Sequence, residues 1–218
     1  MLDWIRRLPP PAELIIVNVL CFGFFAAMSA YELMRGARAH VFDDAYLLLV
    51  VAIEVVTGLA ALSFLRLRGW KWSDFGLRVS MPETIAGSLL FVFYTLIGYV
   101  MYQLAAAIAG PDFTRFVKVE TKASLAVVLL VIAVNPLFEE LFEVAYNTRA
   151  LEKQGAGVAI TTSAVIRFVC HLYQGPVATV TVLPIGLLFA FVYWRWRRLW
   201  PLVVAHGLAD WFGLTQLG

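Results

Sequence analysis

The sequence predicts an all-α fold, a polytopic transmembrane helix bundle of about seven spans with an interfacial amphipathic segment. Three observations predict it: 61% of the 218 residues are hydrophobic, only 15% are charged, and the mean hydropathy is +0.81. Soluble domains usually carry about 25% charged and about 45–50% apolar residues. A chain of this size cannot bury so much apolar surface inside one globule, so we expect lipid to cover it.

Apolar windows of about 20 residues, the length that a helix needs to cross a bilayer, recur along the whole chain. Pro82, Pro111, Pro176 and Pro201 lie near the ends of these windows, where a missing backbone N–H costs least. The predicted spans are 12–34, 45–65, 83–109, 124–149, 157–173, 177–194 and 199–217.

The stretch 69–78 is predicted to lie at the membrane interface rather than across it. Trp70, Trp72 and Phe75 alternate there with Lys71 and Arg78, a mixture that suits the lipid headgroup layer.

The distribution of positive charges predicts the orientation. With seven spans, the side of the N-terminus receives eleven Lys and Arg residues and the other side receives five, so the N-terminus is predicted in the cytoplasm and the C-terminus on the opposite side. The eleven are Arg6, Arg7, Arg66, Arg68, Lys71, Arg78, Arg149, Lys153, Arg195, Arg197 and Arg198, and the five are Arg35, Arg38, Arg115, Lys118 and Lys122. A net charge of +2 gives no reason to expect a nucleic-acid partner.

Ionisable residues inside predicted spans gather in the second half of the chain, although each costs about 2.5–3.5 kcal/mol at the centre of a membrane helix. They are Glu139, Glu140, Glu143, Arg167, His171, His206 and Asp210. Glu143 follows Glu139 by four positions and Glu140 by three. The pairs Arg167 with His171 and His206 with Asp210 are each four positions apart, so each span presents its polar residues on one side of a helix. Because none can face lipid, we expect all three polar faces to meet in one interior pocket.

The charges in this pocket favour catalysis. Four carboxyl groups face a single arginine, so some must remain protonated or a cation must join them. A glutamate beside histidines is typical of a general base that activates water. Two histidines and a glutamate equally suit a zinc ion with an open coordination position.

Other interpretations fit parts of the pattern. A Glu–Glu pair inside a span suits a proton relay in a proton-coupled transporter, and Glu143 could simply form a salt bridge with Arg167. Cys170 beside His171 suggests a thiol nucleophile, but neighbouring residues point about 100° apart on a helix. Glu54, in the second predicted span, is interpreted as a helix-packing residue.

The order of these residues resembles a known family. Glu139-Glu140, a following span with His171, and His206-Gly207-Leu208-Ala209-Asp210 resemble the CAAX prenyl protease and bacteriocin-processing (CPBP, also called Abi) family of intramembrane peptidases. Its members carry Glu-Glu-x-x-x-Arg, Phe-x-x-x-His and His-x-x-x-Asn/Asp motifs in this order on successive helices. The chain is therefore expected to consist of N-terminal membrane spans, 1–123, and a CPBP-like catalytic helix core, 124–218, within one integral membrane domain.

The resemblance implies an intramembrane endopeptidase in which Glu139 activates water together with His171. It implies that His206 and Asp210 bind the oxyanion or complete the site, and that Glu140 orients its neighbours or binds metal. Family members have been described both as metalloproteases and as metal-independent glutamate proteases, so zinc held by Glu139, His171 and His206 stays open. The implied substrates are membrane-anchored or prenylated peptides. A non-catalytic immunity or scaffold protein is the remaining alternative.

The sequence departs from the family motifs at two positions. The arginine of the first motif falls at Val144, and the phenylalanine of the second falls at Arg167. One hypothesis explains both departures: the positive charge has moved from the fourth span to the fifth, near the glutamates, with Glu143 as its new partner. The other is that the altered motifs no longer support catalysis.

Overall fold

The computed structural model describes residues 3–36, 40–110 and 119–216. Three positive residues that entered the orientation count, Arg38, Arg115 and Lys118, lie outside the described residues. Pro111 and Leu217 also lie outside them.

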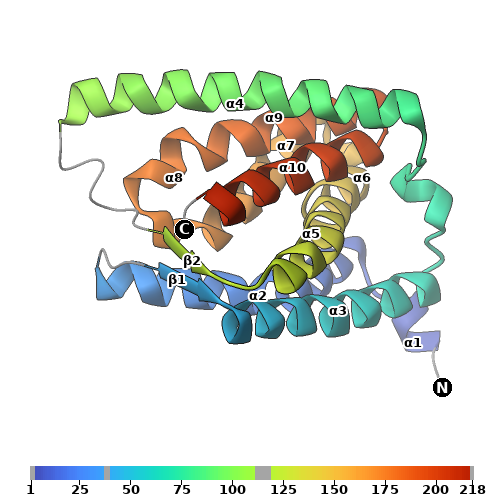
Figure 1. Ribbon diagram of the computed structural model, residues 1–218. Coiled ribbons are helices and arrows are strands. Elements are labelled where there is room, and N and C mark those ends of the chain that lie inside the picture. The colour runs from blue at the N-terminus through green and yellow to red at the C-terminus, as the bar shows by residue number, and fades with distance from the viewer. Residues whose placement is uncertain (1–2, 37–39, 111–118, 217–218) are drawn as a thin grey trace.

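The chain folds into a bundle of helices, and the predicted fold class is confirmed (Figure 1). Within the described residues the first half contains α1 (Asp3–Arg6), α2 (Pro10–Arg35), β1 (His40–Asp43), α3 (Asp44–Leu67), a 3-10 turn (Trp72–Phe75), α4 (Met81–Ala109) and β2 (Val119–Lys122). The second half contains α5 (Leu125–Glu139), a π-helix (Glu140–Tyr146), α6 (Asn147–Ala150), a 3-10 turn (Glu152–Gln154), α7 (Ala156–Cys170), a 3-10 turn (Leu172–Gln174), α8 (Pro176–Val180), α9 (Val182–Trp196) and α10 (Trp200–Gln216).

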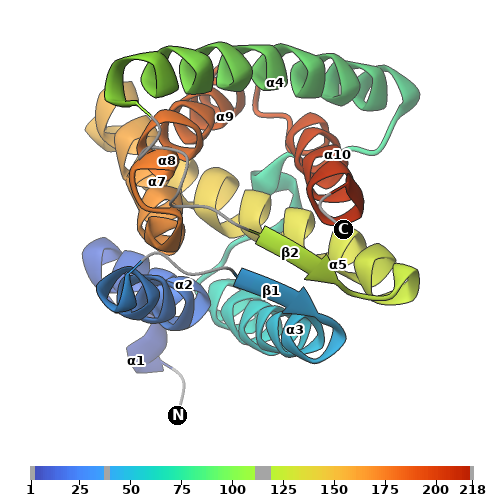
Figure 2. The same cartoon turned by 60° about the vertical axis from the view of Figure 1, so that its left-hand side comes forward.

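The helices pack so that α5 lies inside the bundle. It packs against α3 on one side and α10 on the other, while α7 packs against α2 and α9. Helix α4 covers α10 from outside, and α2 with α3 forms the opposite face, as the turned view in Figure 2 shows. This arrangement surrounds the polar residues of α5 with other helices.

All seven predicted spans contain helix, with small changes at their ends. Within the described residues, five helical segments are long and apolar enough to cross a membrane: Pro10–Arg35, Asp44–Leu67, Met81–Ile108, Leu125–Ala150 and Val177–Trp196. Helices α7 and α10, with 15 and 17 residues, are shorter than the roughly 20 residues of a full crossing. The count of seven therefore stays a prediction.

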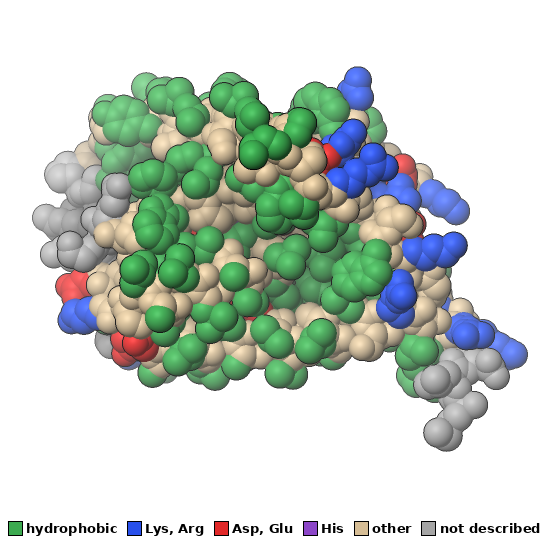
Figure 3. All heavy atoms as spheres, turned by 45° about the vertical axis from the view of Figure 1, so that its right-hand side comes forward, with side chains coloured by type: hydrophobic (Ala, Val, Ile, Leu, Met, Phe, Trp, Pro, Cys, Tyr) green, Lys and Arg blue, Asp and Glu red, His purple; other side chains and the backbone are tan. Residues whose placement is uncertain are grey.

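Helix α4 shows how the sequence provides a surface for lipid. Ile85, Leu89, Val92, Leu96 and Val100 recur every three or four residues, and more than half of each side chain is exposed. Figure 3 shows hydrophobic side chains over most of the visible surface. Ser80 starts this helix, because its hydroxyl accepts a hydrogen bond from the Glu83 backbone N–H.

One feature was not predicted from the sequence: strands β1 and β2 form a two-stranded parallel sheet. His40 pairs with Val119 and Asp43 pairs with Lys122. The Asp43 carboxylate also accepts a hydrogen bond of 2.8 Å from the Tyr46 N–H, which caps α3. The sheet ties the start of α3 to the segment that enters α5.

The predicted interfacial segment is only partly at the surface. Trp72 is 51% exposed, as an interfacial residue should be, but Phe75 is buried and its ring stacks on Trp70. The Trp70 indole N–H donates to Glu13 at the start of α2, so this segment also fixes α2 to α3.

Basic side chains gather at one end of the bundle (Figure 3). A cavity of about 550 Å³ at this end is lined by Arg78, Arg149, Arg197 and Arg198, all from the group of eleven. Helix α2 begins and α10 ends at opposite ends of the bundle (Figure 1), as an odd number of crossings requires. Which end faces the cytoplasm stays a prediction.

Candidate active site

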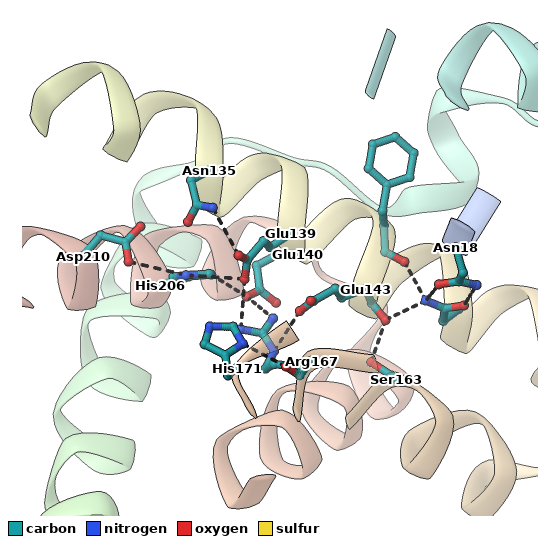
Figure 4. Close-up of polar contacts among 12 residues, drawn as sticks. Asn18, Asn135, Glu139, Glu140, Glu143, Ser163, Arg167, His171, His206 and Asp210 are labelled. Atoms are coloured by element: carbon teal, nitrogen blue, oxygen red, sulfur yellow. Dashed lines mark hydrogen bonds and ion pairs between the residues drawn. The ribbon is translucent and has the colours of Figure 1, made fainter. Parts of the chain in front are cut away.

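The seven polar residues predicted to share a pocket come together in the structure (Figure 4). Glu139 ends α5, and Glu140 and Glu143 follow in the π-helix. Arg167 lies in the last turn of α7 and His171 directly after it. The last helix, α10, contributes His206 and Asp210. Within this group, Glu140 and Glu143 are fully buried.

Arg167 lies among the three glutamates. Its guanidinium approaches Glu140 at 2.5 Å, Glu143 at 3.1 Å and Glu139 at 3.6 Å. The arginine is itself only 5% exposed, so little water screens these attractions. The hypothesis that the motif's positive charge has moved to the fifth span requires this contact with Glu143.

His206 has a carboxylate at each ring nitrogen. Its Nδ1 lies 2.7 Å from Glu140 Oε1, and its Nε2 lies 3.5 Å from Asp210 Oδ1 and 3.8 Å from Glu139 Oε2. Carboxylates on both sides favour an imidazole that carries protons on both nitrogens and donates hydrogen bonds. His206 therefore joins the polar face of α10 to both motif glutamates.

His171 is oriented by the backbone. Its Nδ1 lies 2.8 Å from the Arg167 carbonyl oxygen. Because a carbonyl only accepts hydrogen bonds, Nδ1 carries the proton, and a neutral ring then has its lone pair on Nε2. This is the tautomer that an imidazole base needs.

A π-helix places the carboxylates, inside the predicted span 124–149. In a π-helix the backbone bonds run from residue i to i+5, and such turns are frequent at functional sites. Side chains satisfy carbonyl groups of the widened turn: Asn147 Nδ2 donates to Phe142 and Glu143, and Ser163 donates to Glu143 at 2.6 Å. Asn18 of α2 holds Asn147 through two amide hydrogen bonds of 2.8 and 3.0 Å.

Two cavities border this cluster. The larger, of about 390 Å³, is lined by Glu139, His171, His206 and Asp210 among many apolar residues of α2 and α3. The smaller, of about 320 Å³, is lined by the last three of these and by Arg167. The acids and the imidazoles thus face common space inside the protein.

Two residues of this space were not predicted as site residues. Glu54 of α3 is 2% exposed, and its Oε1 accepts a hydrogen bond of 2.6 Å from Asn135 Nδ2. The same nitrogen donates to Glu139 Oε1 at 3.1 Å. The sequence signal was a lone carboxyl group inside an early span, but its partner depends on how α3 packs against α5.

The donor set does not fit the metal ion that the family resemblance left open. Among the described residues, no three His, Cys, Asp or Glu side chains are grouped so that they could hold a metal. The Arg167 guanidinium lies against the three glutamates, where a cation would otherwise bind. Cys170 borders the larger cavity, but no contact places its thiol on His171 within the described residues.

Comparisons with known proteins bear on the second half of the chain. Residues 121–212 match the family model described as type II CAAX prenyl endopeptidase Rce1-like. No curated protein and no solved structure matches the chain. The match contains every predicted site residue, and at the family level it indicates an intramembrane endopeptidase. The second half of the chain therefore resembles the Rce1-like CAAX proteases, and the resemblance inferred from the three motifs is confirmed.

Proposed function

We propose that this protein hydrolyses a peptide bond of a membrane-anchored or lipid-modified peptide within the bilayer, using water activated by Glu139 and His171. One observation carries the proposal: Glu139 at the end of α5, His171 directly after α7 and His206 of α10 border one cavity. A general base must reach its water by a hydrogen bond, so such groups have to share one space.

The two carboxylate oxygens of Glu139 have different roles in this proposal: one is held by a neighbouring side chain, and the other accepts the proton of the water. Glu139 Oε1 accepts the Asn135 hydrogen bond, while the buried Oε2 accepts no hydrogen bond within the described residues and lies 3.6 Å from the Arg167 guanidinium and 3.8 Å from His206 Nε2. We assign Oε2 to the water molecule, with His171 Nε2 as the second acceptor. Glu139 takes a proton as the water oxygen attacks the scissile carbonyl carbon, and returns it to the leaving amine when the C–N bond breaks.

His206 is assigned to the oxyanion that forms on the scissile carbonyl oxygen. Glu140 holds its Nδ1 at 2.7 Å, and its Nε2, 3.5 Å from Asp210, can offer an N–H to this oxygen without reorganisation during the reaction. Arg167 offsets the charge of Glu140 and Glu143, so these carboxylates can remain close to the developing negative charge.

The walls of the larger cavity support an apolar substrate. Phe22, Phe25 and Met28 of α2 and Leu47 and Val50 of α3 line it beside the acids. Such walls bind hydrocarbon and leave few polar groups to select a soluble peptide. A lipid-modified or membrane-embedded peptide fits this lining.

The test is cleavage by the purified protein in liposomes. The probes are a farnesylated CAAX peptide and an unmodified transmembrane peptide, and the products are identified by mass spectrometry. Glu139→Gln should lower turnover by about 10²–10⁴-fold, the usual contribution of a general base. Glu120→Gln is the matched control, because Glu120 is an exposed carboxylate on β2.

Two outcomes would contradict the proposal. Retained turnover in Glu139→Gln removes the assigned base. Proton flux through the liposomes without hydrolysis of either probe would favour the proton-coupled transporter instead.

A further inference from the structure

One carboxyl group near the proposed base comes from outside the family-matched segment. Glu54 lies on α3, whereas the match covers residues 121–212. It occupies the inner side of its helix, in register with the buried residues Val51 and Gly58. Val55 and Val56 next to it are exposed on the surface that faces lipid. The structure therefore turns Glu54 inward, toward α5.

Packing alone does not explain a glutamate here. A charged side chain at the centre of a membrane helix costs about 2.5–3.5 kcal/mol, and leucine would fill similar space without that cost. Among the described residues Glu54 has no ion pair, and its buried Oε2 has no hydrogen-bond partner. The hydrogen bond that Glu54 accepts from Asn135 is therefore the contact that explains a carboxyl group at this position.

The Asn135 amide joins two carboxyl groups. Its NH₂ group has two hydrogens, and the nitrogen lies 2.6 Å from Glu54 Oε1 and 3.1 Å from Glu139 Oε1. An amide can rotate by 180° and present its oxygen instead of its nitrogen. With the oxygen toward Glu139, two acceptors would face each other and the hydrogen bond would be lost. Glu54 holds the amide in the productive orientation, because it too accepts from the nitrogen.

The helix contact that brings these residues together is built into the sequence. Gly58, one turn after Glu54, lies against Phe138, and a Cβ at this glycine would be 3.1 Å from the Phe138 ring. Phe138 directly precedes Glu139. A glycine on α3 and an aromatic ring on α5 therefore set the close approach that Asn135 spans.

We infer that Glu54 is a positioning residue for Glu139, acting through Asn135. In this arrangement, drawn for Asn135 and Glu139 in Figure 4, the amide fixes Glu139 Oε1, so that Oε2, which faces Arg167 and His206, is the oxygen assigned to the water. The inference rests on the proposed function, since it concerns the orientation of the assigned base. It extends the site to a helix that the family model does not cover.

The test separates positioning from packing by using kcat, KM and a conservative variant. Glu54→Leu should lower kcat on the farnesylated peptide by about 10–100-fold, the usual cost of losing a partner that orients a reactive group, and leave KM within about twofold. Glu54→Gln should keep most of kcat, because its amide oxygen still accepts from Asn135. Thr57→Val is the matched control, since Thr57 is a polar residue of α3 whose hydroxyl, within the described part of the chain, donates to the Ile53 carbonyl alone.

A double-mutant cycle tests the route through Asn135. Asn135→Leu should lower kcat about as much as Glu54→Leu. The kcat of the double variant should equal that of the less active single variant, because both substitutions disrupt the same hydrogen-bonded unit. The inference would be overturned if the decreases in kcat of the two single variants multiply in the double variant. It would also be overturned if kcat is unchanged in Glu54→Leu, or if Glu54→Gln loses as much kcat as Glu54→Leu.

The two proposals fail in different ways. If Glu139→Gln is inactive but Glu54→Leu turns over normally, only the role of Glu54 is wrong. If wild-type protein cleaves neither probe, or Glu139→Gln remains active, the proposed function is wrong and the role of Glu54 is overturned with it.

Discussion

At the scale of single residues, Arg167 is the cation that lies among the three glutamates of the site. It stands where the family motif has phenylalanine, and Val144 stands where the motif has arginine. Val144 is fully buried in the π-helix, while Arg167 contacts all three glutamates. These contacts are the ones that the hypothesis of a moved positive charge requires.

Replacement of Arg167 should destabilise the protein and inactivate it. Arg167→Phe leaves buried carboxylates without their cation, a change that typically costs about 3–5 kcal/mol. We expect this loss in the free energy of unfolding, measured by denaturant titration in mixed micelles. Arg35→Leu should change it by less than about 1 kcal/mol, since Arg35 pairs with Glu32 at the surface.

The hypothesis that the arginine has moved from position 144 to position 167 can be tested by moving it back. If the charge has moved between helices, adding Val144→Arg to Arg167→Phe should restore part of the stability and turnover. An inactive double variant beside an inactive Arg167→Phe would count against the exchange.

His171 should be essential for turnover but not for folding. In His171→Asn, the side-chain amide can still donate to the Arg167 carbonyl, but the lone pair of Nε2 is gone. Turnover should fall by at least about 10²-fold, as expected for loss of a proton acceptor, with unchanged helix content by circular dichroism. Turnover near the wild-type level would exclude His171 from water activation.

The sequence predicted most of the residues in this cluster but not all their contacts. Intramembrane charges at helical spacing identified Glu139, His171 and His206, because lipid excludes such groups from the outer surface. Glu54 and Asn135 were not assigned to the site. Their hydrogen bond depends on how closely α3 packs against α5, and this distance cannot be predicted from a single sequence.

At the scale of elements, the helices were predictable and their irregularities were not. Long apolar windows determine where a span runs, since unpaired backbone groups cannot face lipid. The widened turn Glu140–Tyr146 depends on Asn147, Ser163 and Asn18, which come from three different elements. The four-residue strands β1 and β2 are too short to show a pattern and depend on each other across the chain.

The crossing of α4 and α10 depends on one glycine. A Cβ at Gly87 would lie 2.6 Å from the Pro201 carbonyl oxygen and 2.7 Å from Val204 Cβ. Gly87→Ala should therefore lower the melting temperature, because overpacking typically costs about 1–3 kcal/mol. It should also lower turnover, because α10 carries His206.

Gly98→Ala provides the control within the same helix. Among the described residues, and apart from the backbone of α4 itself, nothing lies within 4 Å of a Cβ at Gly98, so this variant gains the same helix propensity without a clash. Equal melting temperatures for the two variants, measured by scanning fluorimetry in detergent, would contradict the proposed close approach.

At the scale of the whole molecule, the two halves of the sequence form one body. Glu13 of α2 accepts from Arg68, Trp70 and Tyr146, and Asn18 bonds to Asn147. Helix α2 therefore supports the helices of the second half through polar contacts as well as through packing. The sequence motifs do not predict these contacts, because the motifs lie only in the second half of the chain.

The sidedness of the bundle can be measured with single cysteines in a background where Cys21 and Cys170 are replaced by alanine. Ser73→Cys lies at the Arg-rich end and Glu120→Cys at the end that carries the sheet, and both positions are exposed. In right-side-out vesicles, a membrane-impermeant maleimide should label Glu120→Cys and spare Ser73→Cys, as the excess of Lys and Arg predicts. The reverse labelling would show the opposite orientation.

The parallel pairing of β1 and β2 has a consequence for biosynthesis. The paired residues His40 and Val119 are 79 positions apart, with α3 and α4 between them. A nascent chain can join these strands only after both intervening helices have left the translocon, and closing so long a loop is slow. The ribosome therefore reaches residue 122 before β1 acquires its partner strand.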